Sequence, residues 1–213
     1  MTDHRMDWDR AERTGTSEAV LCDSKSVDQI AAILRTAEEA GRRLFLTRLA
    51  PDRAVAVARA GLDYDALSQT AVLGGDLAPP LRGGIGIVAA GTSDLPVAAE
   101  AQRTLSFHGV AAPITADVGV AGLWRLMEQV EALRQHQILI AIAGMEGALF
   151  SVLTGLVRAP VIAVPAPVGH GVAQGGRVAL DSALGSCAAG LVVVNIGNGF
   201  GAACAALRML GDR

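Results

Sequence analysis

Aromatic residues are scarce in this chain, which holds only two tryptophans, one tyrosine and four phenylalanines among 213 residues. Hydrophobic residues nevertheless make up 51% of the sequence, and many of them are alanine and valine, beside 25 glycines. Small side chains let helices pack closely against a sheet. The composition therefore favours a doubly wound α/β fold, in which helices cover both faces of a parallel sheet.

Cysteines are also few, and Cys22, Cys187 and Cys204 stand at unrelated spacings. An odd number of cysteines without a CxxC pair predicts neither a disulfide framework nor a zinc knuckle. Reduced thiols in a cytoplasmic protein are the expectation.

The chain lacks a strong charge of either sign, since its formal net charge is −3. This balance gives no electrostatic case for nucleic acid or an anionic membrane as a partner. No apolar run approaches the ~20 residues that cross a bilayer. Residues 1–10 are charged and have no apolar core of the kind a signal peptide needs.

Two regions differ in pattern. Most of the charge lies in residues 1–80, which we expect to form a small N-terminal α/β domain. The expected elements there are helices at 26–40 and 52–60 and a strand at 44–47, with a Gly- and Pro-rich linker at 73–84.

From residue 84 onward, apolar runs alternate regularly with helical patterns, which predicts a second domain at 84–213 built on a parallel sheet. The expected strands are 85–90, 110–114, 138–143, 161–164 and 191–195. The expected helices are 96–107, 122–133, 148–157 and two more that end near residues 186 and 210. Polar loops after the strands then lie at the carboxyl edge, where such sheets bind ligands.

The first of these loops runs from Gly91 through Thr92 and Ser93 to Asp94, followed by Pro96 in the first turn of a helix. Ser93 or Asp94 can cap that helix. Free N–H groups at a helix start favour a bound phosphate or carboxylate, although a capped helix without a ligand has the same sequence.

A second loop places Glu146 between Gly144 and Gly147, directly after a buried strand. Burial beside the strand end would raise the pKa of this carboxyl and suit it to acid or base chemistry. The alternative is a solvent-exposed glutamate in a turn.

The third loop, residues 168–176, holds four glycines in nine residues and predicts a mobile binding loop. It is not a Walker A motif, because no Gly-Lys-Ser/Thr follows. His170 is either catalytic or an exposed histidine without a role. A fourth segment, 195–201, has asparagines and glycines that suit left-handed turns and hydrogen bonds to a ligand or to neighbouring loops.

Together these motifs resemble the LarB family, the carboxylase/hydrolases that begin synthesis of the nickel-pincer nucleotide cofactor from nicotinic acid adenine dinucleotide. The motifs that carry the resemblance are Asp7-x-x-Arg10-x-x-Arg13-x-Gly15-x-x-Glu18, Lys25, Thr47-Arg48 and the segments 90–94, 117–122, 144–148, 186–190 and 194–201. The C-terminal part is also similar to PurE, the aminoimidazole ribonucleotide carboxylase/mutase. Departures from the expected pattern are Phe150, Pro167, His170, Gly185 and Gly197.

The resemblance implies a PurE-like or flavodoxin-like parallel sheet and carboxylation of C5 of the nicotinate ring, with cleavage of the phosphoanhydride to release AMP. Carbon dioxide or bicarbonate would be the co-substrate. Mg²⁺ would help to stabilise charge on the phosphate oxygens. The small-molecule dinucleotide and a homo-oligomer, with an octamer as one option, are the implied partners.

The implied chemistry changes the interpretation of Cys187. A lone cysteine with apolar neighbours is usually a small buried hydrophobe. The pyridinium ring is electron-poor, however, and a thiolate that adds to it would produce an enamine-like ring able to attack carbon dioxide. Cys187 is therefore the expected nucleophile, while Cys22 and Cys204 are expected to be structural.

Other roles follow from the same resemblance. Glu146 is the expected base for the C5 proton, with Asp94 as the second candidate. The adenylate half would be held by Arg10, Arg13, Lys25 and Arg48, unless these form a solvated basic face. The remaining expected substrate contacts are Gly91, Thr92, Ser93, Asp117, Gly144, Met145, Gly169, His170, Gly171 and Asn198.

Two other functions stay open at this point. A PurE-like mutase acting on an aminoimidazole ribonucleotide would need no thiol, and Cys187 and the N-terminal region argue against it. A non-catalytic flavodoxin-like nucleotide-binding module is disfavoured by three polar loops that converge on one sheet edge.

Overall fold

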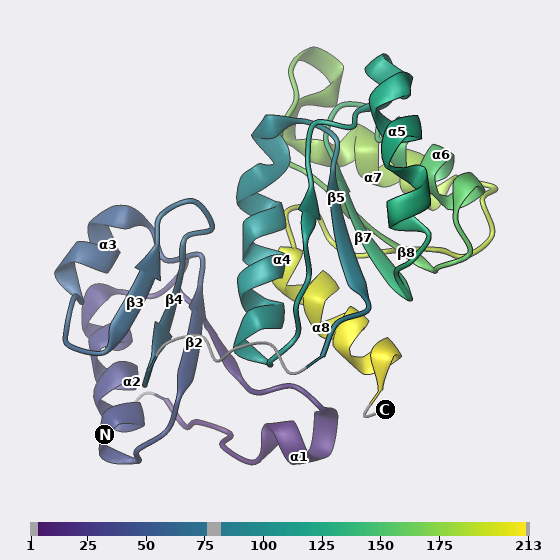
Figure 1. Cartoon of the computed structure of the whole chain (residues 1–213). Coiled ribbons are helices and arrows are strands. Elements are labelled where there is room, and N and C mark those ends of the chain that lie inside the picture. Colours follow the sequence, from purple (N-terminus) through teal and green to yellow (C-terminus); the bar gives the residue numbers. More distant parts are fainter. Residues whose placement is uncertain (1–3, 76–81, 212–213) are drawn as a thin grey trace.

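The computed structural model describes residues 4–75 and 82–211, which form two α/β units with a sheet each (Figure 1). We call residues 4–75 the N-terminal unit and residues 82–211 the C-terminal unit. Residues 76–81, the middle of the expected linker, lie outside the described residues.

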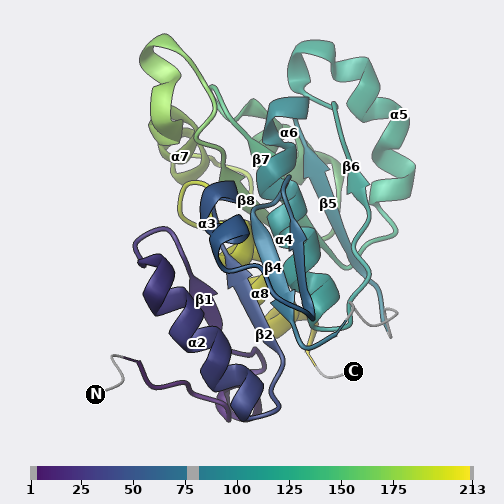
Figure 2. The same cartoon turned by 90° about the vertical axis from the view of Figure 1, so that its left-hand side faces the viewer.

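The N-terminal unit has a four-stranded sheet in the order β1-β2-β4-β3, in which β1 and β2 are parallel and β4 is antiparallel to both of its neighbours. Its elements are α1 (Arg10–Thr14), β1 (Ala19–Leu21), α2 (Val27–Glu39), β2 (Leu44–Thr47), α3 (Pro51–Ala56), β3 (Leu62–Asp65) and β4 (Thr70–Leu73). A capping box between Ser26 and Gln29 begins α2. Figure 2 shows α2 in front of this sheet, on the face turned away from the C-terminal unit.

The helix expected at 26–40 and the strand at 44–47 are present as α2 and β2. The helix expected at 52–60 is shorter and ends at Ala56. Strands β1, β3 and β4 were not predicted, because three or four residues are too few for a periodic pattern. In the turn between β3 and β4, Gln69 has a positive φ of 51°. Glycine or asparagine is usual at such a position, so the sequence contains no sign of a hairpin here.

The C-terminal unit has five parallel strands in the order β6-β5-β7-β8-β9. Its strands are β5 (Ile85–Ala89), β6 (Ile114–Thr115), β7 (Ile138–Ala143), β8 (Val161–Pro165) and β9 (Leu191–Val193), and its helices are α4 (Leu95–Phe107), α5 (Leu123–Leu133), α6 (Ala148–Leu156), α7 (Arg177–Leu184) and α8 (Gly199–Leu210). The predicted fold class is confirmed.

Helices cover both faces of this sheet, as the small side chains predicted. One core cluster joins α4 and α8 to the sheet, and a second cluster joins α5, α6 and α7 to the opposite face. Strands β5, β7 and β8 are buried along their whole length, which explains their continuous apolar sequences.

One expected strand is much shorter than predicted. In place of 110–114 the sheet has only Ile114 and Thr115, and Val110 makes a single bridge to Arg82. Pro113 has no N–H to donate to a ladder, so regular pairing begins only after it.

The two units pack against each other along α4, which Figure 1 shows between the two sheets. Phe45 of β2 lies with its ring centroid 5.4 Å from that of Phe107 and 6.2 Å from that of Phe200. This aromatic contact fixes the N-terminal sheet beside the end of α4 and the start of α8 through a buried cluster.

None of the helices in the described ranges is both long enough and apolar enough to span a membrane.

Candidate active site

A cavity of about 580 Å³ opens at the carboxyl edge of the C-terminal sheet, and we call it the edge pocket. Four polar loops, which follow β5, β6, β7 and β8, supply its lining. The lining residues are Ala90, Gly91, Ser93, Asp94, Asp117, Gly119, Val120, Ala121, Arg125, Ala143, Gly144, Met145, Glu146, Ala148, Leu149, Val168, Gly169 and His170. Strand-end loops distant in sequence therefore meet in one pocket.

Asp94 is the buried carboxylate of the edge pocket, with 5% of its surface exposed. Its Oδ2 accepts a hydrogen bond from the Gly91 N–H at 2.9 Å, so it closes the preceding turn and makes no side-chain cap for α4. Burial raises the pKa of this carboxyl above its usual value, and the Gly91 hydrogen bond opposes part of that rise. The protonated form of Asp94 is thereby favoured relative to an exposed aspartate.

Glu146 lines the same pocket but is exposed, so the expected burial of this side chain is wrong. Its two neighbours, Met145 and Gly147, both have positive φ values, 50° and 64°. At Gly144 a Cβ atom would lie 2.1 Å from the Val168 carbonyl oxygen. Only glycine permits the loops after β7 and β8 to approach this closely.

Arg125, near the start of α5, is a pocket residue that the sequence reasoning missed. Its guanidinium pairs with Asp117 at 2.5 Å, and Asp117 holds a left-handed backbone with φ 58°. The Nε of Arg125 is buried and has no hydrogen-bond partner among the described residues. The sequence did contain a signal for this residue. Arg125 lies in the first turn of a helix that follows a strand-end loop, and such a turn lies at the carboxyl edge of the sheet.

The glycine-rich loop forms the third wall of the pocket. Gly169 and His170 line it, and His170 is exposed. A Cβ on Gly169 would lie 2.5 Å from the Ala173 carbonyl oxygen, so the loop folds back tightly on the short helix Gly171–Gly176. Thr92 and Gly171 border this pocket in sequence but are not among its lining residues.

Cys187 and Asn198 lie away from the edge pocket. Asn198 caps α8, where its Oδ1 accepts from the Gly201 N–H at 2.8 Å. Cys187 is exposed and precedes β9, whereas the pocket loops follow their strands. The Ser186 hydroxyl, next to Cys187, lies 2.7 Å from the Ser151 hydroxyl near the start of α6, the helix that follows the Glu146 loop. Cys187 itself does not line the edge pocket of its own chain.

The other two thiols are less accessible. Cys22 is fully buried, and burial raises its pKa to about 12. Cys204 on α8 is half-buried, and burial raises its pKa to about 11. Both therefore stay protonated near neutral pH and are poor nucleophiles.

The four expected N-terminal cations are scattered. Arg13 pairs with Asp7 at 2.6 Å on the surface, Arg10 is exposed on α1, and Lys25 lies beside Gln29. Arg13 lines a surface cavity of about 400 Å³ beside Trp8. Arg48 lines a cavity of about 690 Å³ between the two units, which we call the interdomain cleft.

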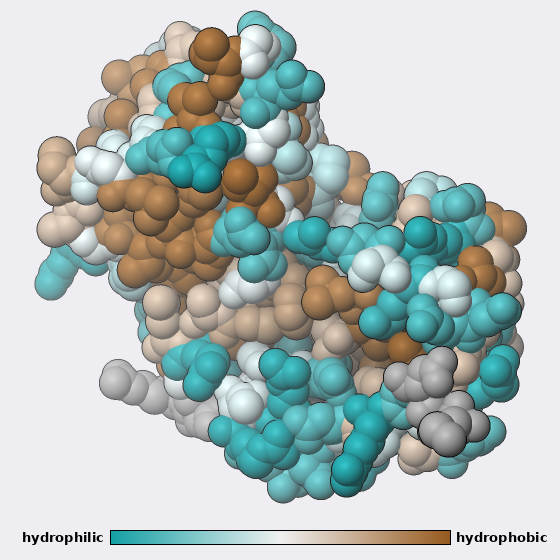
Figure 3. Space-filling model, turned by 180° about the vertical axis from the view of Figure 1, so that it is seen from behind, coloured by the Kyte–Doolittle hydropathy of each residue, from teal (hydrophilic) through white to brown (hydrophobic). Residues whose placement is uncertain are grey.

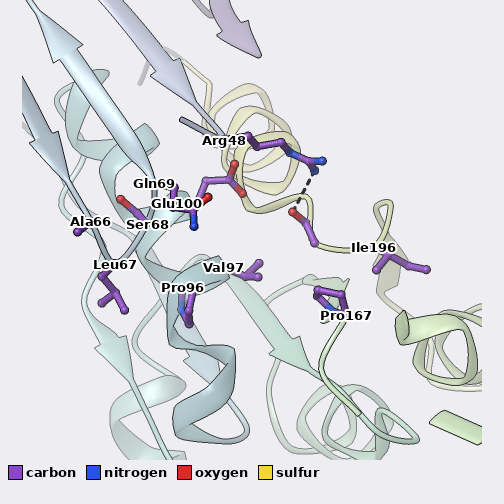
Figure 4. A pocket seen from close by; sticks show the side chains of 11 residues that line it. Arg48, Ala66, Leu67, Ser68, Gln69, Pro96, Val97, Glu100, Pro167 and Ile196 are labelled. Atoms are coloured by element: carbon purple, nitrogen blue, oxygen red, sulfur yellow. Dashed lines mark hydrogen bonds between the residues drawn. The ribbon is translucent and has the colours of Figure 1, made fainter. Parts of the chain in front are cut away.

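Glu100 on α4 is a second residue that the sequence reasoning missed, and it lines the interdomain cleft (Figure 4). It is 5% exposed, accepts from the Thr47 hydroxyl, and accepts from the Phe200 N–H at 3.2 Å. Burial raises the pKa of this carboxyl, while these bonds and nearby Arg48 oppose the rise. The sequence signal for this residue was its setting: Glu100 is the one carboxylate among alanines on the buried face of α4.

No group of three or more His, Cys, Asp or Glu side chains in the described part of the chain is arranged to hold a metal ion. Asp117 is engaged by Arg125 and Asp94 by Gly91. The residues of the edge pocket thus do not form a metal site from protein groups alone.

Comparison with known families agrees with this architecture. A model of the LarB/PurE-like N-terminal domain matches residues 1–74, and the AIR carboxylase model matches residues 84–213. The chain belongs to the LarB family. It combines the N-terminal domain typical of LarB with a PurE-like C-terminal domain, and this membership supports a carboxylase-like or mutase-like enzyme.

Two similar proteins extend the comparison of this LarB-family chain. An uncharacterised protein of Methanocaldococcus jannaschii is 36% identical over 208 residues, which covers 93% of this chain and 80% of that protein. The crystal structure of a point variant of Treponema denticola PurE2 has a TM-score of 0.45 and 24% identity, covering 62% of this chain and 83% of the other.

Proposed function

We propose that this enzyme carboxylates C5 of the pyridinium ring of nicotinic acid adenine dinucleotide and hydrolyses its phosphoanhydride. The products would be AMP and pyridinium-3,5-biscarboxylic acid mononucleotide, in the first step of nickel-pincer nucleotide synthesis. The observation that carries the proposal is the edge pocket of a LarB-family chain, where an exposed and a buried carboxylate stand with one arginine.

The chemistry begins with a thiolate. Addition of the Cys187 sulfur to the cationic ring moves the ring electrons onto nitrogen and gives a neutral, enamine-like dihydropyridine. Its C5 then attacks carbon dioxide and forms the new C–C bond. A base removes the C5 proton, and the thiolate leaves with the C–S electron pair as aromaticity returns.

The two carboxyls of the edge pocket suit different parts of this sequence. Glu146 is exposed and lines the pocket, and in this proposal it accepts the C5 proton from the bound ring. Asp94 is the weaker candidate for that base, because its raised pKa favours the protonated form. Arg125 would bind an anionic group of the mononucleotide half through the part of its guanidinium that Asp117 leaves open, since the side chain is 32% exposed.

Cys187 does not line the edge pocket of its own chain, so the proposal includes a homo-oligomer in which a second copy supplies this thiol. Figure 3 shows hydrophobic residues gathered over the C-terminal unit on its far side relative to Figure 1. Leu184 is 65% exposed and Val192, on the edge strand β9, is 40% exposed; these two residues flank Cys187 in the sequence. An apolar surface beside an unpaired strand edge favours association with another chain.

Mg²⁺ remains a prediction, and no step above depends on it. This ion is commonly held by one or two carboxylates together with substrate phosphates, so the dinucleotide itself would complete its coordination.

The test is product analysis. Purified protein is incubated with nicotinic acid adenine dinucleotide and ¹³C-bicarbonate, with and without added Mg²⁺, and the products are identified by mass spectrometry. We expect AMP and a singly labelled mononucleotide in equal amounts. AMP without any labelled mononucleotide would show a hydrolase only and contradict the proposal.

A PurE-like mutase is the second candidate, because the AIR carboxylase model covers the whole C-terminal unit. Such an enzyme would interconvert carboxylated aminoimidazole ribonucleotides without a thiol. Turnover of those ribonucleotides by a Cys187→Ala variant, with none of the dinucleotide, would favour this candidate.

A further inference from the structure

The interdomain cleft is built by both units. The N-terminal unit supplies Arg48 and the turn before β4, and the C-terminal unit supplies the first turn of α4 and the loops after β8 and β9. Its lining residues are Arg48, Ala66, Leu67, Ser68, Gln69, Pro96, Val97, Glu100, Pro167, Ile196 and Gly197 (Figure 4). A cavity of this volume is large enough for a nucleotide-sized ligand.

The lining combines one cation, the buried Glu100 carboxyl and the polar Ser68 and Gln69 with apolar surface. The Glu100 carboxyl accepts hydrogen bonds from the Thr47 hydroxyl and the Phe200 N–H. The Arg48 side chain is 39% exposed, donates to the Gly197 carbonyl oxygen at 3.2 Å and lies 3.6 Å from an Asp23 carboxylate oxygen. Most of its five donors are thus left for a ligand. Leu67, Pro96, Pro167 and Ile196 present flat or branched apolar groups around it (Figure 4).

The cleft is adjacent to the edge pocket. Asp94 lines the pocket and Pro96 lines the cleft, two residues apart at the start of α4. On the other side, Val168 lines the pocket and Pro167 lines the cleft. One extended ligand can therefore pass over these two segments with one end in each cavity.

We propose that the interdomain cleft binds the adenylate half of the dinucleotide, with Arg48 on a phosphate and the purine against the apolar wall around Leu67. The proposal rests on the proposed function for the identity of the dinucleotide. Of the four N-terminal cations expected to hold the adenylate half, this proposal uses Arg48 alone. It gives the N-terminal unit a role in substrate recognition.

The experiment measures AMP binding to the full-length protein by calorimetry. The wild-type protein is expected to bind AMP, and Arg48→Ala is expected to weaken that binding about ten- to a hundredfold, as for loss of a charge-assisted hydrogen bond. Leu67→Glu places a carboxylate on an exposed part of the wall and should weaken AMP binding by repulsion of the phosphate. Nicotinate mononucleotide should bind Arg48→Ala and the wild-type protein equally well.

Two matched controls lie away from both cavities. Arg35→Ala removes an exposed arginine of α2, and Val55→Glu adds a carboxylate at a 78% exposed position of α3. Both should bind AMP like the wild-type protein. Absence of AMP binding to the wild-type protein, or unchanged affinity in both Arg48→Ala and Leu67→Glu, would overturn the proposal. Arg48-dependent AMP binding by a protein that makes no labelled mononucleotide would support the cleft and overturn the proposed function.

Discussion

The edge pocket and the interdomain cleft differ in construction although they share a border. The edge pocket belongs to the C-terminal sheet alone and gathers the carboxyls of Asp94, Asp117 and Glu146 around one arginine. The interdomain cleft needs both units and offers one arginine and one buried carboxyl, that of Glu100, among mainly apolar groups. The difference suggests a division in which bond making occurs in the pocket while the cleft provides affinity and selectivity for a dinucleotide.

The largest effect is expected at Cys187. We predict that Cys187→Ala abolishes carboxylation because no enamine-like ring can form, while both cavities keep their ligand affinities. Product formation is followed by mass spectrometry and folding by circular dichroism. Cys204→Ala is the matched control and should stay active, since that half-buried thiol has a raised pKa. Formation of labelled product by the Cys187→Ala variant would contradict the proposed addition of the Cys187 thiolate to the ring.

The next effect separates chemistry from binding inside the edge pocket. Glu146→Gln should lower kcat by about a hundredfold to ten-thousandfold, the usual range for loss of a general base. Dinucleotide affinity should hardly change, because Glu146 is exposed and makes no hydrogen bond that orders the described loops. A parallel loss of affinity, measured by calorimetry, would assign Glu146 to substrate binding.

A smaller effect, on ligand affinity, is expected at Arg125, and it should fall on the opposite ligand from the effect of Arg48→Ala. Arg125→Ala should weaken nicotinate mononucleotide about ten- to a hundredfold and leave AMP unaffected, the reverse of Arg48→Ala. Calorimetry with the two ligands gives both values. Equal losses for both ligands in Arg125→Ala would mean that the two cavities are not separate subsites.

The smallest effect concerns the contact between the units at low pH. His108 Nε2 accepts from the Ser17 N–H at 3.2 Å while Nδ1 lies 2.8 Å from the Thr104 carbonyl oxygen, so the imidazole must be neutral. Burial lowers the pKa of His108, with Arg43 and Arg82 acting in the same direction.

The direction of the pH dependence follows from that lowered pKa. As the pH falls through about 6.5, the unfolded chain takes up a proton at His108 before the folded chain does, and stability falls. Thermal unfolding should therefore show a Tm that declines below this pH, and His108→Gln should decline less. Parallel curves for the two proteins would exclude His108 as the cause.

The sequence predicted the C-terminal unit well and the N-terminal unit poorly, for one physical reason. Strands buried on both faces, such as β7, give unbroken apolar runs, whereas β1, β3 and β4 are short and join a mixed sheet. The strand-end loops of the edge pocket were predictable because parallel strands share a carboxyl edge. Arg125 and Glu100 were missed because they lie within helices, and contact between distant elements gives them their places.

The position of Cys187 remains the sharpest constraint on the mechanism. The family resemblance implies that this thiol takes part in the reaction, yet it does not line the edge pocket of its own chain. The account therefore requires that the edge pocket of one copy works with Cys187 of another.

Subunit complementation tests this requirement most directly. Chains carrying Cys187→Ala and chains carrying Glu146→Gln are each expected to be nearly inactive, and they are co-expressed to form mixed oligomers. If the two residues come from different copies, about a quarter of the sites in a random one-to-one mixture regain both, and carboxylation returns to that extent. If mixed oligomers stay as inactive as the separate variants, Cys187 and Glu146 act within one chain or not together, and the central claim is contradicted.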